Sequence, residues 1–129
     1  MKRTGFLTTA VLLVMILAAS CEFDRSMIHV VEVEVTSTSD TVQTANIDVR
    51  VGQSQTGRDN VELPYREEVD RVRQYVGHQF PVEATAAHSS GAGDITVTVY
   101  INGGVFDTAA SSGPNARATV TGDVINITY

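Results

Sequence analysis

Alternation of apolar and polar residues at every second position is the feature that most limits the folds open to this chain. It begins in IHVVEVEVTS (28–37) and returns in NIDVRV (46–51) and DITVTVYINGGVF (94–106). Because successive side chains of a strand point to opposite faces, each stretch predicts a half-buried β-strand. The residues expected to face inward are Val31, Val33, Val35, Ile47, Val49, Val51, Ile95, Val97, Val99, Ile101, Ala116, Ala118, Val120, Ile125 and Ile127.

Turn residues separate these strands. Asn102-Gly103 is the strongest short hairpin signal, and SSGAGD (89–94) and SSGPN (111–115) are further clusters of turn-forming residues. Several short strands divided by such turns indicate an all-β fold, an antiparallel β-sandwich.

One segment fits two interpretations. In REEVDRVRQYVGHQF (66–80), Val69, Val72 and Val76 recur at helical spacing, and Glu67 and Arg71 stand four residues apart as in a helical ion pair. Pro64 before the segment suits the start of either a helix or an edge strand. Helix and strand therefore both remain open for residues 66–76.

The N-terminal residues predict export. Lys2 and Arg3 precede an uncharged stretch, residues 5–20, that shows no polar face at helical spacing. This stretch is shorter than the roughly 20 apolar residues that a permanent membrane span needs. It ends in Ala18, Ala19, Ser20 and Cys21, which resemble the lipobox of bacterial lipoproteins, although that motif prefers leucine where Ala18 stands. The resemblance implies cleavage before Cys21 and a lipid on its sulfur, with an ordinary signal peptide or an uncleaved anchor as the alternatives.

This interpretation divides the chain into a signal peptide (1–20), a lipidated cysteine with a short tether (21–27) and one domain (28–129). The sequence has 9 basic and 15 acidic residues, and Lys2 and Arg3 would leave with the signal. Subtraction gives 9 − 2 = 7 arginines and a net charge of 7 − 15 = −8 for the mature chain. Such a domain is repelled by phosphate backbones and by anionic lipid headgroups, so neither a nucleic-acid partner nor a polybasic membrane patch is expected.

Candidate chemistry is sparse. His29, His78 and His88 lack the spacing of a metal site, and His29 is assigned to the charged face of the first strand. Sequence motifs for a nucleophile elbow, a zinc protease, a P-loop or a dinucleotide site do not occur. We therefore expect no catalytic residues, no metal and no cofactor.

The order of the strand motifs resembles the mycobacterial MmpS family of small membrane-anchored proteins and its lipoprotein relatives. The resemblance covers residues 28–122 and includes HVVEVEVTS, TANIDVRV, a Leu63-Pro64-Tyr65 step, the hairpin from Ile95 to Gly103 and the turn at Ser112-Gly113. It implies an immunoglobulin-like sandwich outside the cytoplasm that assists exporters of the resistance-nodulation-division type. The chain departs from the family in two respects. Cys21 replaces the usual anchoring helix, and Val97 and Val120 stand where many members carry a cysteine pair.

The expected function is that of a non-catalytic accessory lipoprotein of a bacterial cell envelope, held to a membrane through Cys21. The expected partner contacts are Leu63, Pro64, Tyr65 and Gly113, although Leu63 to Tyr65 also suit a purely structural corner. Two other functions remain open: a tethered protein that binds a small amphipathic ligand, and a self-assembling structural lipoprotein. An envelope enzyme ranks below all of these, because no nucleophile or metal set is visible.

Overall fold

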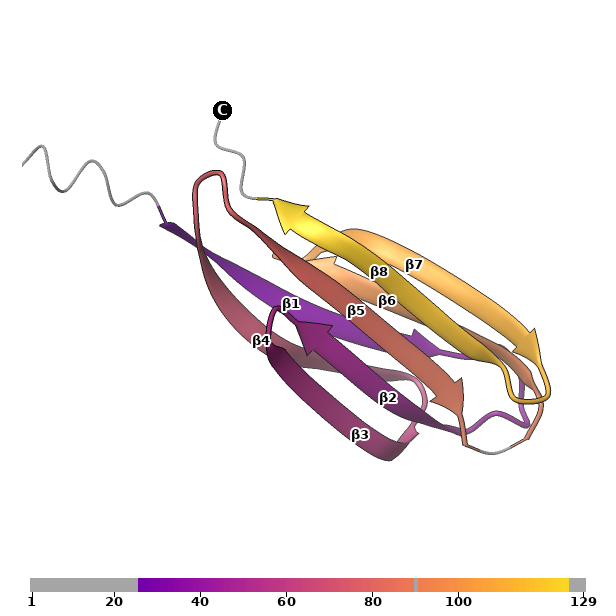
Figure 1. Ribbon diagram of the computed structural model, residues 1–129. Helices are drawn as coiled ribbons and strands as arrows, with labels where there is room; N and C mark the ends of the chain where they lie inside the picture. The colour runs from indigo at the N-terminus through magenta and orange to yellow at the C-terminus, as the bar shows by residue number, and fades with distance from the viewer. Residues whose placement is uncertain (1–25, 90, 126–129) are drawn as a thin grey trace, which may run out of the picture.

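The computed structural model describes residues 26–89 and 91–125, which form eight β-strands in two layers (Figure 1). The strands are β1 (Ser26–Thr36), β2 (Thr44–Val51), β3 (Ser54–Glu62), β4 (Tyr65–Tyr75), β5 (Gln79–His88), β6 (Gly93–Ile101), β7 (Gly104–Gly113) and β8 (Arg117–Ile125). The predicted all-β fold is confirmed. The predicted signal peptide and Cys21 lie outside the described residues.

The two sheets have four antiparallel strands each, in the orders β4-β1-β6-β7 and β3-β2-β5-β8. We call them the first and the second sheet. Only the β2–β3 and β6–β7 hairpins connect strands of the same sheet, and every other connection crosses between sheets. The predicted antiparallel sandwich is therefore confirmed, and this arrangement is compatible with an immunoglobulin-like fold.

The core lies between the sheets and consists mainly of valine and alanine. Val31, Val33 and Val35 of β1 and Ile95, Val97 and Val99 of β6 are fully buried against the inward rows of β2, β5 and β8. Each fully buried valine contributes roughly 1.5 kcal/mol or more to folding. The alternation seen in the sequence thus places the core correctly over most of its length.

The prediction fails at the last strand. Val124 is buried and Ile125 is 52% exposed, whereas the sequence suggested an inward row that begins at Ile125. The strand continues through Gly122 without a break, so the even-numbered positions that begin with Ala118 stay inward. Ile127 lies outside the described residues.

Residues 66–75 belong to β4 and Val76 lies in the turn that follows, so the helical alternative is wrong. The register between β4 and β1 shifts between Val31, which pairs with Asp70, and Glu32, which pairs with Glu68. Val69 is the extra residue of this β-bulge, which moves the inward positions of β4 from odd to even numbers. Val69 and Val72 can therefore both pack against the core although they are three residues apart.

His29 also lies on a different face from the one expected. It follows the same alternation as Val31 and is 6% exposed, with its ring 5.8 Å from that of Phe80. Its Nδ1 lies 3.3 Å from Nδ2 of Asn102, while its buried Nε2 has no hydrogen-bond partner among the described residues. The assignment to the charged face was an error of parity, because position 29 is odd like the inward valines.

The sandwich is elongated, and its two ends differ in what they carry (Figure 1). At the N-terminal end, β1 begins, the β4–β5 turn reverses the chain and β8 finishes. At the far end lie the β1–β2 connection, the β3–β4 corner, the β5–β6 loop and the β7–β8 turn.

Candidate functional site

The chain enters the sandwich at its N-terminal end. Ser26 opens β1 and pairs with Tyr75, the last residue of β4. Four residues separate Ser26 from Cys21, the predicted lipid attachment site, which lies outside the described residues. A lipid on Cys21 would therefore be attached close to this end of the domain.

Leu63, Pro64 and Tyr65 form the corner where the chain passes from the second sheet to the first. The Leu63-Pro64 peptide is cis, and the Leu63 amide donates a hydrogen bond of 2.9 Å to the carbonyl of Gln43. Leu63 and Tyr65 are half-buried and pack against the core, whereas Pro64 is exposed. Pro64 is thus the one residue of the three that is free for a partner.

An ion pair joins the two sheets beside this corner. Arg58 of β3 lies 3.1 Å from a carboxylate oxygen of Glu67 on β4, and the Tyr65 hydroxyl donates to the other oxygen. These bonds hold the pKa of Glu67 below its ordinary value, with the Tyr65 hydroxyl as the largest cause. Burial, together with the bond to Glu67, raises the pKa of Tyr65. The three side chains bridge β3 and β4, the edge strands on this side of the sandwich.

Gly113, the other predicted contact, is the last residue of β7 and leads into the β7–β8 turn with a φ of 106°, a value that L side chains rarely adopt. The Nε2 atom of His88 lies 3.0 Å from the Gly113 carbonyl and 3.0 Å from the Ala116 amide. In one tautomer His88 donates to Gly113, and in the other it accepts from Ala116, so either form ties the turn to the end of β5.

The structure does not bring the predicted contact residues together. The Leu63–Tyr65 corner and Gly113 share the far end of the sandwich (Figure 1). Tyr65 begins one edge strand of the first sheet and Gly113 ends the other, with β1 and β6 between them. A single partner would need to cover the width of the sheet to touch both.

Hydrogen bonds also fix the loops of the far end. Asp94 at the start of β6 accepts the backbone amide of Thr38 at 3.0 Å and its hydroxyl at 2.7 Å. The Ser37 hydroxyl donates to the Asp94 carbonyl at 2.6 Å. The bonds from Thr38 lower the pKa of Asp94. The β1–β2 connection is therefore held against the first sheet.

Sequence reasoning missed a polar network on the outer face of the first sheet. The guanidinium of Arg66 lies 4.0 Å above the ring of Tyr100 and 3.0 Å from a carboxylate oxygen of Glu32. The Tyr100 hydroxyl donates to Glu34 at 3.0 Å. These residues come from β4, β1 and β6, so only the pairing of those strands could have revealed the network.

A shallow depression of about 380 Å³ on the outer face of the second sheet was missed for the same reason. It opens above Gly57, where an added Cβ would meet no atom within 4 Å. Asp48 in its wall accepts hydrogen bonds from the Gln55 amide at 3.1 and 3.2 Å. The lining residues are Asn46, Ile47, Asp48, Gln55, Gly57, Asp59, Thr85, Ala87 and Arg117. This mixture of carboxylates, amides and a guanidinium suits a small polar group.

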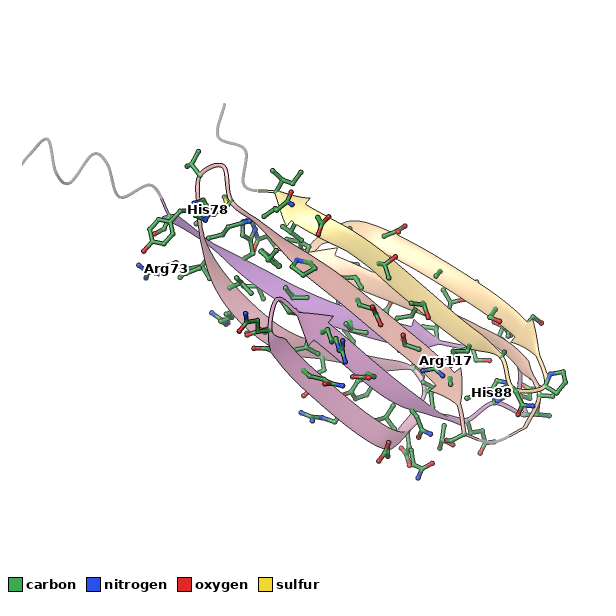
Figure 2. The ribbon with its side chains drawn as sticks, in the orientation of Figure 1. Arg73, His78, His88 and Arg117 are labelled. Atoms are coloured by element: carbon green, nitrogen blue, oxygen red, sulfur yellow. The ribbon has the colours of Figure 1, made fainter. Side chains whose placement is uncertain are left out.

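The three histidines lie at different places. Figure 2 shows His78 beside the N-terminal end, near Arg73, and His88 at the far end, near Arg117. Among residues 26–89 and 91–125, no three histidine, cysteine or acidic side chains gather as a metal site would require.

Across the same described ranges, the structure contains no helix long and apolar enough to cross a membrane. Comparison with known proteins adds no relative: no protein-family model matches this chain, and no curated protein matches it.

Proposed function

We propose that this chain is a non-catalytic lipoprotein of a bacterial envelope, whose β-sandwich serves as an accessory domain of a membrane exporter of the resistance-nodulation-division type. The family part of this proposal comes from the order of sequence motifs, which resembles that of MmpS proteins. The anchor part comes from the apolar leader that ends in Ala18, Ala19, Ser20 and Cys21.

The observation that carries the proposal is that the chain entry and the predicted contact residues lie at opposite ends of the domain. The chain enters at one end, and the exposed Pro64 and the β7–β8 turn lie at the other (Figure 1). A lipid at Cys21 would hold the first end to the membrane and leave the second free to meet the part of an exporter that projects from it. The loops of the far end are held by Asp94 and His88, so they would offer a partner a preformed surface.

The anchor is tested first. Cys21→Ser should abolish both processing at this site and incorporation of labelled fatty acid. Labelling that persists in this variant would refute lipid attachment at Cys21.

Crosslinking tests the partner. Photoreactive residues at Glu62 and Ser112, both exposed and next to the two predicted contacts, should capture a membrane protein in intact cells. Thr121, exposed on the outer face of the second sheet, is the matched control and should capture much less. Capture that yields only other copies of this chain would favour the self-assembling structural lipoprotein instead.

The depression on the second sheet supports a second candidate, a tethered binding protein for a small ligand. Its charged and amide lining favours a polar ligand over an amphipathic one. Arg117→Ala would abolish capture of such a ligand and leave crosslinking from Glu62 unchanged, which separates the two functions.

A further inference from the structure

Large apolar side chains are exposed at the N-terminal end of the sandwich. Met27 and Ile28 of β1 are 50% and 51% exposed, Tyr75 at the end of β4 is 51% exposed, and Val76 follows it at 39%. Ile125, the last described residue of β8, is 52% exposed. Val105, at 65%, is the remaining large apolar residue exposed to this degree within the described residues. It lies farther from this end, because it pairs with Tyr100, which pairs with Glu32 of β1.

The strand pairing brings these five residues to the same level. Ser26 pairs with Tyr75, Met27 with Gln74, and Gln79, after the β4–β5 turn, with Ile125. The Gln74 amide joins the sheets here, because it donates to the carbonyl of Val124 at 3.0 Å and also to that of His78. Three chain segments that are distant in sequence therefore form one surface, which we call the apolar end.

The apolar end differs in charge from the rest of the domain. In residues 26–31, 72–80 and 122–125, the formally charged residues are Arg73 and Asp123, one of each sign. Of the 15 acidic residues, Glu22 and Asp24 precede the described residues, and the other 12 besides Asp123 lie outside these three ranges. The strong negative charge therefore belongs mainly to the middle and the far end. A net charge of −8 argues against contact with anionic headgroups only where that charge is located.

Chain length limits what can cover this end. From Cys21 to Ser26 is five residue steps, which span at most about 17 Å when extended. A diacylglycerol on Cys21 would place that sulfur at the membrane surface, where the headgroup layer is itself roughly 5 to 7 Å thick on each side. The apolar end would thus be confined to the immediate vicinity of the headgroups. Tyrosine is also a residue that membrane interfaces favour, because its ring is apolar and its hydroxyl polar.

We propose that the apolar end rests in the lipid headgroup layer and acts as a second, noncovalent membrane contact that makes the sandwich stand with its far end away from the bilayer. This inference rests on the acylation of Cys21 in the proposed function. The occupant is the lipid surface itself, and no protein is needed for the contact. The lipid anchor holds the apolar end close to the bilayer, so even a weak contact between this end and the headgroups is strengthened by the high local concentration.

The test uses the full acylated chain, purified from membranes and returned to vesicles of phosphatidylethanolamine and phosphatidylglycerol. Cys21 is the only native cysteine, and acylation blocks its thiol, so an introduced cysteine is the single site for a fluorescent label. The label is placed in Val76→Cys at the apolar end or in Ser112→Cys at the far end, both exposed positions. Mass spectrometry of the Cys21 peptide confirms acylation before the measurement.

The label at position 76 should lose most of its fluorescence to a lipid-borne quencher and be protected from aqueous iodide, and the label at position 112 should behave in the opposite way. Ile28→Ser combined with Tyr75→Ser should restore iodide quenching at position 76, whereas Val105→Ser should not. Unchanged melting temperatures show that these exposed substitutions leave the fold intact.

Equal access of iodide to both positions in the acylated protein would overturn the proposal. The accessory function is tested independently, by the crosslinking experiment. Protection at position 76 without lipid quenching, combined with energy transfer between labelled copies, would also overturn it and would identify a second copy as the occupant. Absence of the acyl group would instead refute the proposed anchor.

Discussion

Asn102 and Val30 exchange two hydrogen bonds between the β6–β7 turn and β1. The Val30 amide donates to the side-chain oxygen of Asn102 at 2.8 Å, and the Asn102 amide donates to the Val30 carbonyl at 2.9 Å. With φ values of 52° at Asn102 and 82° at Gly103, the turn is the two-residue hairpin that the sequence predicted. Asn102 therefore extends the pairing between β6 and β1 by one residue beyond Ile101 and Val31.

Asn102→Ala should reduce the free energy of unfolding by about 2 kcal/mol, because it removes the side-chain hydrogen bonds to Val30 and His29 and places alanine at a positive φ. Asn102→Gly keeps the turn and loses only the two side-chain bonds, so about 1 kcal/mol should be lost. Urea unfolding of the two variants measures the difference. Equal losses would show that the positive φ adds nothing to the cost of alanine, and an Asn102→Gly variant as stable as the wild type would show that the side-chain bonds contribute nothing.

Gly91→Ala should destabilise the domain by at least about 2 kcal/mol. Its Cβ would stand 2.2 Å from the Thr41 carbonyl oxygen, and the φ of Gly91 is +75°. Gly57→Ala is the control, since its Cβ meets nothing within 4 Å and it lies inside β3, where alanine is favoured over glycine by roughly 0.5 to 1 kcal/mol. Thermal unfolding should therefore give a melting temperature below that of the wild type for Gly91→Ala and above it for Gly57→Ala.

Val97→Asp should unfold the domain, because an unpaired carboxylate in the core costs several kcal/mol against a total stability of about 5 to 15 kcal/mol. Thr98→Asp places the same group one residue later, on the outer face of β6, and should leave the domain folded. Circular dichroism of both variants tests which face each residue occupies. A folded Val97→Asp variant would contradict the described core.

Stability should fall as the solution is acidified below about pH 4, the ordinary range of carboxyl groups. The pKa values of Glu67, Glu68 and Asp94 are lowered in the folded state, by Tyr65, Arg71 and Thr38 respectively. Groups with a lowered folded pKa stabilise the protein above their unfolded pKa, and this contribution is lost as pH falls through the folded pKa. Asp94→Asn should lower the melting temperature at pH 7 and weaken its dependence on pH between 5 and 3. An unchanged pH dependence would show that Asp94 contributes nothing to it.

The sequence predicted the core well because valine alternates with polar residues along uninterrupted strands. It left β4 undecided because the bulge at Val69 reverses the alternation within one strand, and a reversed period of two imitates a helical spacing. The faces of His29 and Ile125 could have been predicted from their odd numbers, because odd positions point inward in β1 and outward in β8. Both residues were nevertheless assigned to the wrong face.

The surfaces could be predicted less well than the core. The Arg66 and Tyr100 contact, and the depression above Gly57, each combine residues from different strands. The sequence does not state which strands are neighbours or in what register, so it cannot place these side chains together. The apolar end is a similar case, since Ile28, Tyr75 and Ile125 become neighbours only through pairing.

Because β8 finishes at the end where β1 begins, the architecture decides where a reporter can be attached. A fluorescent protein or affinity tag fused directly after β8 would extend from the N-terminal end and compete for space with a membrane or protein that contacts this end. An insertion between Pro114 and Asn115, both exposed, would instead project from the opposite end. If the apolar end rests on the membrane as proposed, localisation or pull-down experiments with such a fusion would report on a chain whose orientation the tag itself had disturbed.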